Sequence, residues 1–189
     1  MTRDTVQLFF ALLTMAALAA TVGLITVRLA AGRSPRAAGV ARGLAPFTNG
    51  IAAVIAATSM LGSLYFSEIA DYLPCTLCWY QRIAMYSLAI ILSIAAFRSD
   101  RAIRAYALPL GGIGASIALY HWLLERFPDL DAGACSVQVP CEFVWFERFG
   151  FVTLAFMALT GFVAIITLVT MPGPPAAIAV PSNPTNRQD

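Results

Sequence analysis

Four cysteines, arranged as two pairs, are the residues of this chain best suited to chemistry. Cys75 and Cys78 lie in the run 74–82, PCTLCWYQR, and Cys135 and Cys141 lie in a polar segment further on. The 189 residues contain no fifth cysteine. Because cysteine occurs only in pairs, each close to the end of a long apolar stretch, the pattern indicates thiol chemistry at a membrane surface rather than packing.

The spacing of Cys75 and Cys78 predicts a redox-active pair at the start of a helix. Residues three apart lie on one helical face, and Pro74 favours a helix start. The partial positive charge and free N–H groups of a helix N-terminus stabilise a thiolate. Arg82 is expected one turn beyond Cys78, where it can hold a thiolate or an oxygen of a bound acceptor. A zinc clamp or a structural disulfide is the alternative, although the Cys135–Cys141 gap exceeds common zinc-site spacings.

The second pair lies in a segment, 125–148, whose composition argues against regular structure. Asp129, Gly133 and Pro140 are typical of loops. A mobile loop can present a disulfide first to a soluble partner and then to Cys75, and an exposed disulfide is the labile, catalytic kind. The alternative is a structural staple of the loop, which leaves the nearby first pair unexplained.

The elements that must position these cysteines are predicted to be membrane helices. Hydrophobic residues make up 59% of the chain, charged residues only 12%, and the mean hydropathy is +0.76; soluble proteins are about half apolar and about a quarter charged. Five apolar stretches are long enough to cross a bilayer as helices. They span residues 6–31, 47–67, 79–97, 106–124 and 149–171. The predicted fold is an all-α polytopic membrane protein.

The chain divides into three predicted segments. Residues 1–46 hold an additional N-terminal transmembrane helix and an arginine-rich loop, residues 47–171 a four-helix core, and residues 172–189 a tail. The first apolar stretch is longer than the ~7–15 residues of a signal peptide's apolar region, so we predict a retained helix, with a signal peptide as the alternative. The tail is rich in Pro, Ala and Asn and is predicted to be disordered.

The arginines predict the orientation of the helices. In an alternating five-helix topology, one side carries eight arginines and two acids, and the other carries four arginines and eight acids. The positive-inside rule places the 28–42 and 98–104 segments and the C-terminus in the cytoplasm. Both cysteine pairs then face outward, where disulfides persist. The net charge of +2 is too small to indicate a nucleic-acid partner.

The run 75–86, CTLCWYQRIAMY, resembles the signature of the DsbB/BdbC disulfide bond formation proteins. The run 119–122, LYHW, and the run 145–150, WFERFG, at the predicted start of the last helix, extend the resemblance over about residues 47–170. The close spacing of the loop cysteines is more similar to the short BdbC branch. The additional N-terminal helix, which would place the N-terminus outside, departs from the family.

The resemblance implies a quinone-dependent dithiol oxidase of the bacterial cytoplasmic (inner) membrane, which reoxidises a soluble DsbA-like protein of the thioredoxin fold. The partner would attack the loop disulfide at Cys135, and Cys141 would pass the electrons to Cys75. Cys78, as a thiolate, would contact a membrane quinone (ubiquinone or menaquinone), with Arg82 beside a quinone oxygen. No metal is implied.

His121, the only histidine, is expected level with the cysteines. It is either a hydrogen-bonded structural residue or a functional one that binds a quinone carbonyl or accepts a proton. Four aromatic residues near the outer boundary fit an interfacial belt or, as a second possibility, the wall of a quinone pocket. These are Trp79, Tyr80, Trp122 and Trp145.

Three other functions compete with the oxidase. A thiol-relay importer of a soft metal such as mercuric ion would need cysteines on the cytoplasmic side, and none is predicted there. A quinone-epoxide reductase of the VKOR type has its CxxC after the loop pair, whereas here CxxC comes first. The third is a non-enzymatic membrane bundle stapled by disulfides.

Overall fold

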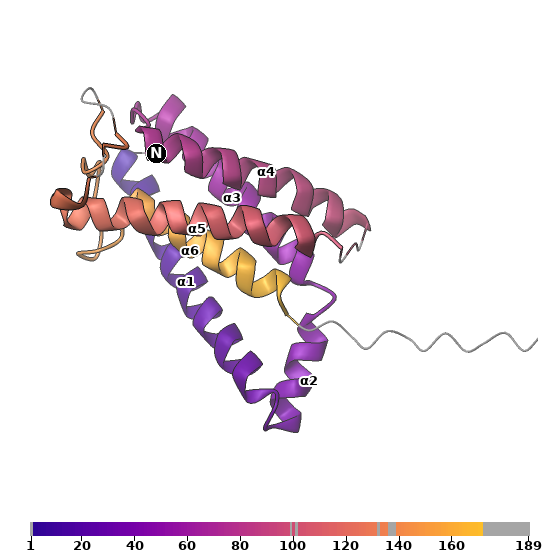
Figure 1. Ribbon diagram of the computed structural model, residues 1–189. Helices are drawn as coiled ribbons and strands as arrows, with labels where there is room; N and C mark the ends of the chain where they lie inside the picture. The colour runs from indigo at the N-terminus through magenta and orange to yellow at the C-terminus, as the bar shows by residue number, and fades with distance from the viewer. Residues whose placement is uncertain (1, 99, 101, 132, 136–138, 172–189) are drawn as a thin grey trace, which may run out of the picture.

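The computed structural model describes residues 2–98, 100, 102–131, 133–135 and 139–171, which form helices and their connections (Figure 1). Within these ranges the only β pairing is an isolated bridge between Arg148 and Val152. The predicted disordered tail lies outside the described residues. The helices are α1 (Arg3–Ala30), α2 (Pro35–Leu44), α3 (Thr48–Glu68), α4 (Thr76–Arg98), α5 (Arg104–Arg126) and α6 (Leu154–Val169), with a 3-10 turn at Pro128–Leu130.

Helices α3 to α6 form the predicted four-helix core. α3 packs against α4 and α6, and α5 packs against the same two helices. Leu88 and Leu92 of α4 meet Phe162 and Ile165 of α6 in the fully buried centre. Gly114 of α5 is required there, because a Cβ atom at this position would lie 2.3 Å from the ring of Phe162. Small residues at helix crossings allow the close approach typical of membrane bundles.

The long helices confirm a polytopic membrane architecture. α1, α3, α4 and α5 are each long and apolar enough to cross a bilayer, and α6 is a shorter apolar helix of 16 residues. The prediction that the last helix begins at residue 149 is wrong. Phe149 and Gly150 have positive φ angles of 55° and 76°, so the chain turns here, and α6 begins only after Thr153, whose side chain accepts the Phe156 N–H.

The predicted arginine-rich loop after α1 contains a further helix, α2. Ser34 caps it by accepting the Ala37 N–H, and Pro35 occupies its first turn. α1 packs against α6, and its C-terminal half leaves the core at an angle to meet α2 (Figure 1). α1 is therefore an addition to the core rather than one of its four helices.

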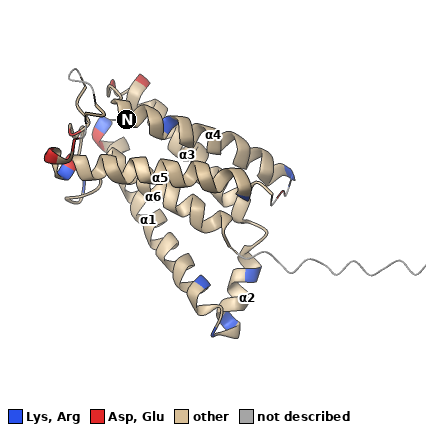
Figure 2. Ribbon diagram, viewed as in Figure 1, with Lys and Arg blue, Asp and Glu red and all other residues tan. Residues whose placement is uncertain are grey.

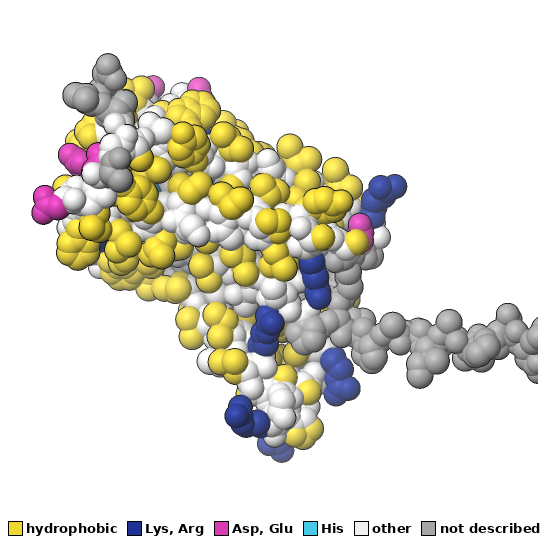
Figure 3. Space-filling view, in the orientation of Figure 1, with side chains coloured by type: hydrophobic (Ala, Val, Ile, Leu, Met, Phe, Trp, Pro, Cys, Tyr) yellow, Lys and Arg dark blue, Asp and Glu magenta, His cyan; other side chains and the backbone are white. Residues whose placement is uncertain are grey.

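Charged side chains lie mainly at the two ends of the molecule (Figure 2). Among the described residues, the acids except Asp100 gather at the end where the chain begins, and the arginines of α2, of the C-terminus of α4 and of the N-terminus of α5 lie at the opposite end. Between them the visible flank carries mostly hydrophobic side chains (Figure 3). This distribution matches helices whose sides face lipid and whose ends face water.

Candidate dithiol and acceptor site

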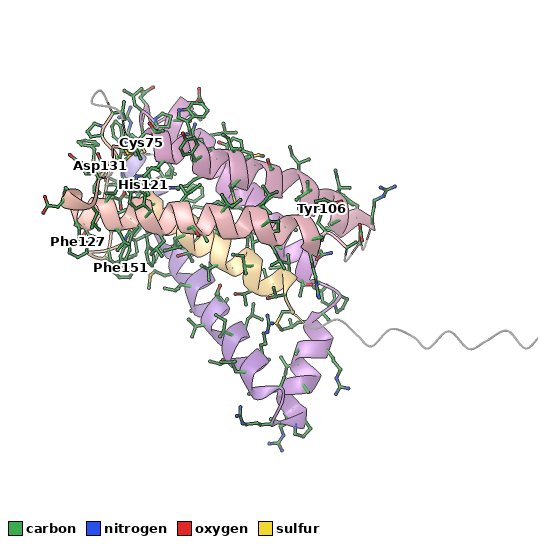
Figure 4. All side chains as sticks on the ribbon, in the orientation of Figure 1. Cys75, Tyr106, His121, Phe127, Asp131 and Phe151 are labelled. Atoms are coloured by element: carbon green, nitrogen blue, oxygen red, sulfur yellow. A yellow bond between two sulfur atoms is a disulfide. The ribbon has the colours of Figure 1, made fainter. Side chains whose placement is uncertain are left out.

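Both cysteine pairs lie at the acidic end of the bundle. Cys75 immediately precedes α4, Cys78 is in its first turn, and the segment after α5 brings Cys135 and Cys141 against them. The four cysteines pack in one cluster with Leu77 and Leu124. Figure 4 shows Cys75 and His121 at this end, with the loop residue Asp131 beyond them. The structure thus brings together two pairs that lie about sixty residues apart in the chain.

Cys75 and Cys78 are free thiols with sulfur atoms 3.0 Å apart. The backbone N–H of Cys78 donates to Cys75 Sγ at 3.3 Å, as expected for a side chain that caps a helix. The hydrogen bond with the Cys78 thiol, opposed by burial and supported by His121, lowers the pKa of Cys75 from 9.0 to about 4. In the reduced pair the thiolate is therefore favoured on Cys75. The Cys78 thiolate that the family resemblance implies belongs to the step at the quinone and stays a prediction.

His121 connects the two pairs. Its Nε2 lies 3.1 Å from the carbonyl oxygen of Cys141 and 3.7 Å from Cys75 Sγ. A carbonyl oxygen only accepts hydrogen bonds, so Nε2 carries a proton. Nδ1 lies 2.9 Å from the side-chain nitrogen of Gln81 and accepts from it. His121 is thus a hydrogen-bonded buried residue whose Nε2–H points at the junction of the pairs. It also contributes to the wall of the cavity beside Cys78, where a contact with a quinone carbonyl stays a prediction.

The loop pair is a disulfide with unequal exposure of its two halves. Cys135 and Cys141 are bonded, with their Cα atoms 5.8 Å apart. Cys141 is 2% exposed and lies inside the cysteine cluster, whereas Cys135 is half-buried at its edge. A soluble thiol can therefore approach Cys135 more readily than Cys141.

Cys75, Cys78 and His121 also have the ligand types of a soft-metal site. One ligand atom from each lies within 4.8 Å of the others. A structural zinc site takes four protein ligands, and the described residues provide three in this group.

A cavity of about 250 Å³ lies between α1, α3, α4 and α6, with Cys78 in its wall. Arg82, which is one helical turn beyond Cys78 in α4, lies in the same wall. Its guanidinium donates to the carbonyl oxygen of Ser63 at 3.0 Å and covers the Trp79 ring, 5.3 Å from the ring centroid. Tyr86, one further turn along, keeps a buried hydroxyl for which the described residues offer no hydrogen-bond partner. The wall thus combines a thiol, a cation and a hydroxyl on one face of α4.

The four predicted aromatic residues lie in three different environments. Trp145 lines the cavity and stacks on Tyr72, with ring centroids 4.7 Å apart. Trp79 and Tyr80 are about half exposed on the outer side of α4, as expected for an interfacial belt. Trp122 donates to the Phe151 carbonyl oxygen, away from the cavity.

The sequence did not predict the roles of Gln81 and of one face of α1. Gln81 holds His121, although it belongs to the quoted run around the CxxC pair. The other group comes from α1, whose role the sequence left open: Phe10, Leu13, Thr14 and Ala17 form part of the cavity wall. A helical spacing of three and four residues was the available signal, but any membrane helix shows such apolar faces.

Fold and site together define a polytopic helical membrane protein with two interacting cysteine pairs at one end. Residues 45–139 match the family model described as "Disulfide bond formation protein DsbB". The chain is 45% identical over 119 residues to disulfide bond formation protein C of Bacillus subtilis, covering 62% of this chain and 86% of that one. It is 50% identical over 111 residues to a probable disulfide formation protein C of Halalkalibacterium halodurans, covering 58% and 81%.

The chain therefore belongs to the DsbB family of disulfide bond formation proteins and is similar to its BdbC members. No solved structure matches it. Helices α1 and α2 precede the residues matched by the family model, and Cys141 and α6 follow them. Membership supports thiol–disulfide chemistry at a membrane.

Proposed function

We propose that this protein oxidises a soluble dithiol protein outside the cytoplasm and passes the electrons through its two cysteine pairs to a membrane quinone. The observation that carries the proposal is the position of Cys78, which belongs both to the reactive pair and to the wall of the cavity. One sulfur can thus exchange with Cys75 and face a lipid-soluble acceptor. The partner is expected to be a DsbA-like protein of the thioredoxin fold.

Graded burial supports the order of thiol exchange. The partner's thiolate attacks Cys135, the accessible half of the loop disulfide, and releases Cys141 as a thiol. A second partner thiol resolves this mixed disulfide, so the partner leaves oxidised and the loop is reduced. The CxxC pair accepts the electrons in its oxidised form, a Cys75–Cys78 disulfide, and Cys141 lies in the same cluster as Cys75. Cys141 attacks Cys75 and releases Cys78, and Cys135 then attacks Cys141 and releases Cys75. The loop disulfide re-forms, and the CxxC pair holds the two electrons and two protons as the free dithiol that the structure shows. Nε2–H of His121 can stabilise the Cys75 thiolate at this junction.

The cavity wall fits a quinone by its chemistry. A quinone has a flat apolar ring with carbonyl oxygens, and Arg82 and Tyr86 offer donors beside otherwise apolar surroundings. When bound, a quinone supplies the capacity to accept two electrons and two protons. Cys78 would face the ring, and Arg82 would orient it through charge-assisted hydrogen bonds.

The charge distribution supports an outward orientation of the cysteine end. Cytoplasmic ends of membrane proteins carry the excess of arginine and lysine, and the arginines of α2, of the C-terminus of α4 and of the N-terminus of α5 lie opposite the cysteines. The C-terminus would then be cytoplasmic. An outward position suits the thiol chemistry, because disulfides persist in extracytoplasmic compartments.

The decisive experiment measures quinone reduction by the purified full-length protein, supplied with a reduced DsbA-like dithiol protein. We expect one quinol formed per partner disulfide formed, with a rate that depends on both substrates. Oxidation of the partner without quinol formation would refute the quinone assignment, and absence of both would refute the proposal.

Orientation is tested separately in intact cells. After mild reduction, a membrane-impermeant maleimide should modify Cys135. Modification that requires prior opening of the membrane would place the loop in the cytoplasm and exclude the proposed extracytoplasmic oxidase.

A further inference from the structure

We infer that α1, the helix outside the family-model match, forms the wall of the acceptor cavity that binds the apolar tail of the quinone. This inference rests on the proposed function, since it assigns the acceptor of that same site. It gives the additional helix a role in substrate binding.

One face of α1 lines the cavity. Phe10, Leu13, Thr14 and Ala17 follow the i, i+3, i+4, i+7 spacing of a single helical face. Residues of the other faces, such as Leu12, are exposed on the outside of the helix and have the character of lipid contacts. α1 therefore separates the cavity from the surrounding membrane along two turns of its length.

The Phe10 ring fixes the level of α1 relative to the redox end. It lies directly on Gly62 of α3, where an added Cβ atom would be 2.6 Å from the ring. The neighbouring residue, Ser63, accepts the hydrogen bond from Arg82. Phe10 and Arg82 thus contact α3 at the same turn. The Phe10 end of the α1 face, which is nearer the cysteines, is therefore level with the predicted quinone ring.

The Ala17 end of the α1 face is further from the cysteines and lies deeper in the membrane-spanning region. Ala17 is seven residues beyond Phe10, about 10 Å along the helix axis. The cavity wall at this depth includes Val54, Ile55 and Thr58 of α3. A quinone whose ring lies beside Arg82 would extend its apolar tail along this part of α1.

A polar network holds the outer end of α1 in this position. Arg148 donates to Asp4 and to Gln7, each at 2.6 Å, and Gln7 donates to the Tyr72 hydroxyl at 2.6 Å. Gln7 is only 7% exposed. Tyr72 lies in the segment that leads to Cys75, so α1 is attached to the same structure that positions the dithiol.

Matched substitutions on neighbouring positions test the inference. Ala17→Trp fills the cavity, whereas Ala16→Trp places the same ring on an exposed position outside the cavity wall. With a quinone carrying a decyl tail, we expect Ala17→Trp to raise the apparent KM about tenfold and Ala16→Trp to change it less than twofold. With a tailless dimethoxy-methyl-benzoquinone, Ala17→Trp should change KM less than threefold.

A second matched pair keeps the test decisive if tryptophan disturbs folding. Leu13→Ala removes part of the apolar cavity wall, and Leu12→Ala removes a side chain of equal size from the adjacent position, which does not line the cavity. The two leucines are 41% and 53% exposed, so they differ mainly in their contact with the cavity. Only Leu13→Ala should raise KM for the tailed quinone, about threefold to fivefold. If the wild type reduces quinone and the two variants of each pair have equal effects on KM, the role of α1 is refuted while the proposed function stands. Failure of the wild type to reduce either quinone would instead refute the proposed function.

Discussion

Cys75 and Cys78 begin a helix and are enclosed by the bundle, whereas Cys135 and Cys141 form a disulfide in a loop with one half-buried sulfur. The first pair is surrounded by groups that control its charge: a helix N–H, His121 and, beyond Cys78, Arg82. The second pair has few such groups among the described residues, and its distinctive feature is that Cys135 is only half-buried and can be reached by a soluble thiol. Electrostatics thus controls the inner pair, and exposure controls the outer one.

The largest expected effect divides the two pairs by their substrates. Cys78→Ser should reduce quinone no faster than the uncatalysed reaction, because the inner pair can no longer form a disulfide. It should still form a mixed disulfide with the partner, which gel mobility under non-reducing conditions will show. Cys135→Ser should lose that adduct. Normal quinone reduction by Cys78→Ser would show that the pairs do not act in series.

Arg82 should matter to one half of the reaction only. Arg82→Gln removes a charge-assisted hydrogen bond of roughly 1.5–3 kcal/mol, which corresponds to about a tenfold to hundredfold loss in quinone kcat/KM. Arg82→Lys should recover part of it, since an ammonium lacks the planar fork of the guanidinium. The rate of exchange with the partner is the internal control and should remain within about twofold of wild type. Unchanged quinone kinetics would reduce Arg82 to a boundary residue that binds Ser63.

The charge of the inner pair should appear as an unusual pH profile. With a Cys75 pKa of about 4 instead of 9.0, thiolate absorbance at 240 nm should persist at neutral pH and disappear as the pH falls through about 4. The same shift stabilises the folded, reduced protein at neutral and higher pH, and this contribution is lost toward pH 4. Cys75→Ser should abolish the transition, and His121→Gln should raise its midpoint, because the contact with His121 lowers the Cys75 pKa. A midpoint near 8 or 9 in the wild type would contradict the electrostatic control of this pair.

The smallest effects concern the attachment of α1. Gln7→Leu leaves the half-buried Tyr72 hydroxyl without its donor and removes one of the two acceptors of Arg148, which keeps Asp4, so we expect a loss of about 1–3 kcal/mol in unfolding free energy. Arg3→Gln removes an exposed ion pair with Asp71, whose side chains are 59% and 78% exposed, and should cost less than about 1 kcal/mol. Thermal unfolding in detergent compares the two variants. Equal losses would mean that α1 is not held by the Gln7 network.

Much of the architecture follows from local sequence. The five apolar stretches predicted the membrane helices because an apolar run of bilayer length must satisfy its own backbone hydrogen bonds. The CxxC spacing with Pro74 predicted a pair at a helix start, and α4 begins at Thr76. The start of α6 was predicted wrongly, because hydropathy does not register the turn at Phe149 and Gly150 that ends only at Thr153.

The site depended on contacts between distant residues, which only the tertiary structure decided. Cys75 and His121 are 46 residues apart, and Gln7 and Tyr72 are 65 residues apart. The sequence determined which chemical groups the chain carries and that they meet a membrane boundary. Packing decided that Cys75 receives the helix N–H and the His121 contact, and that α1 closes the cavity beside Cys78. Such arrangements arise from the joint fit of several helices, and no local spacing encodes them.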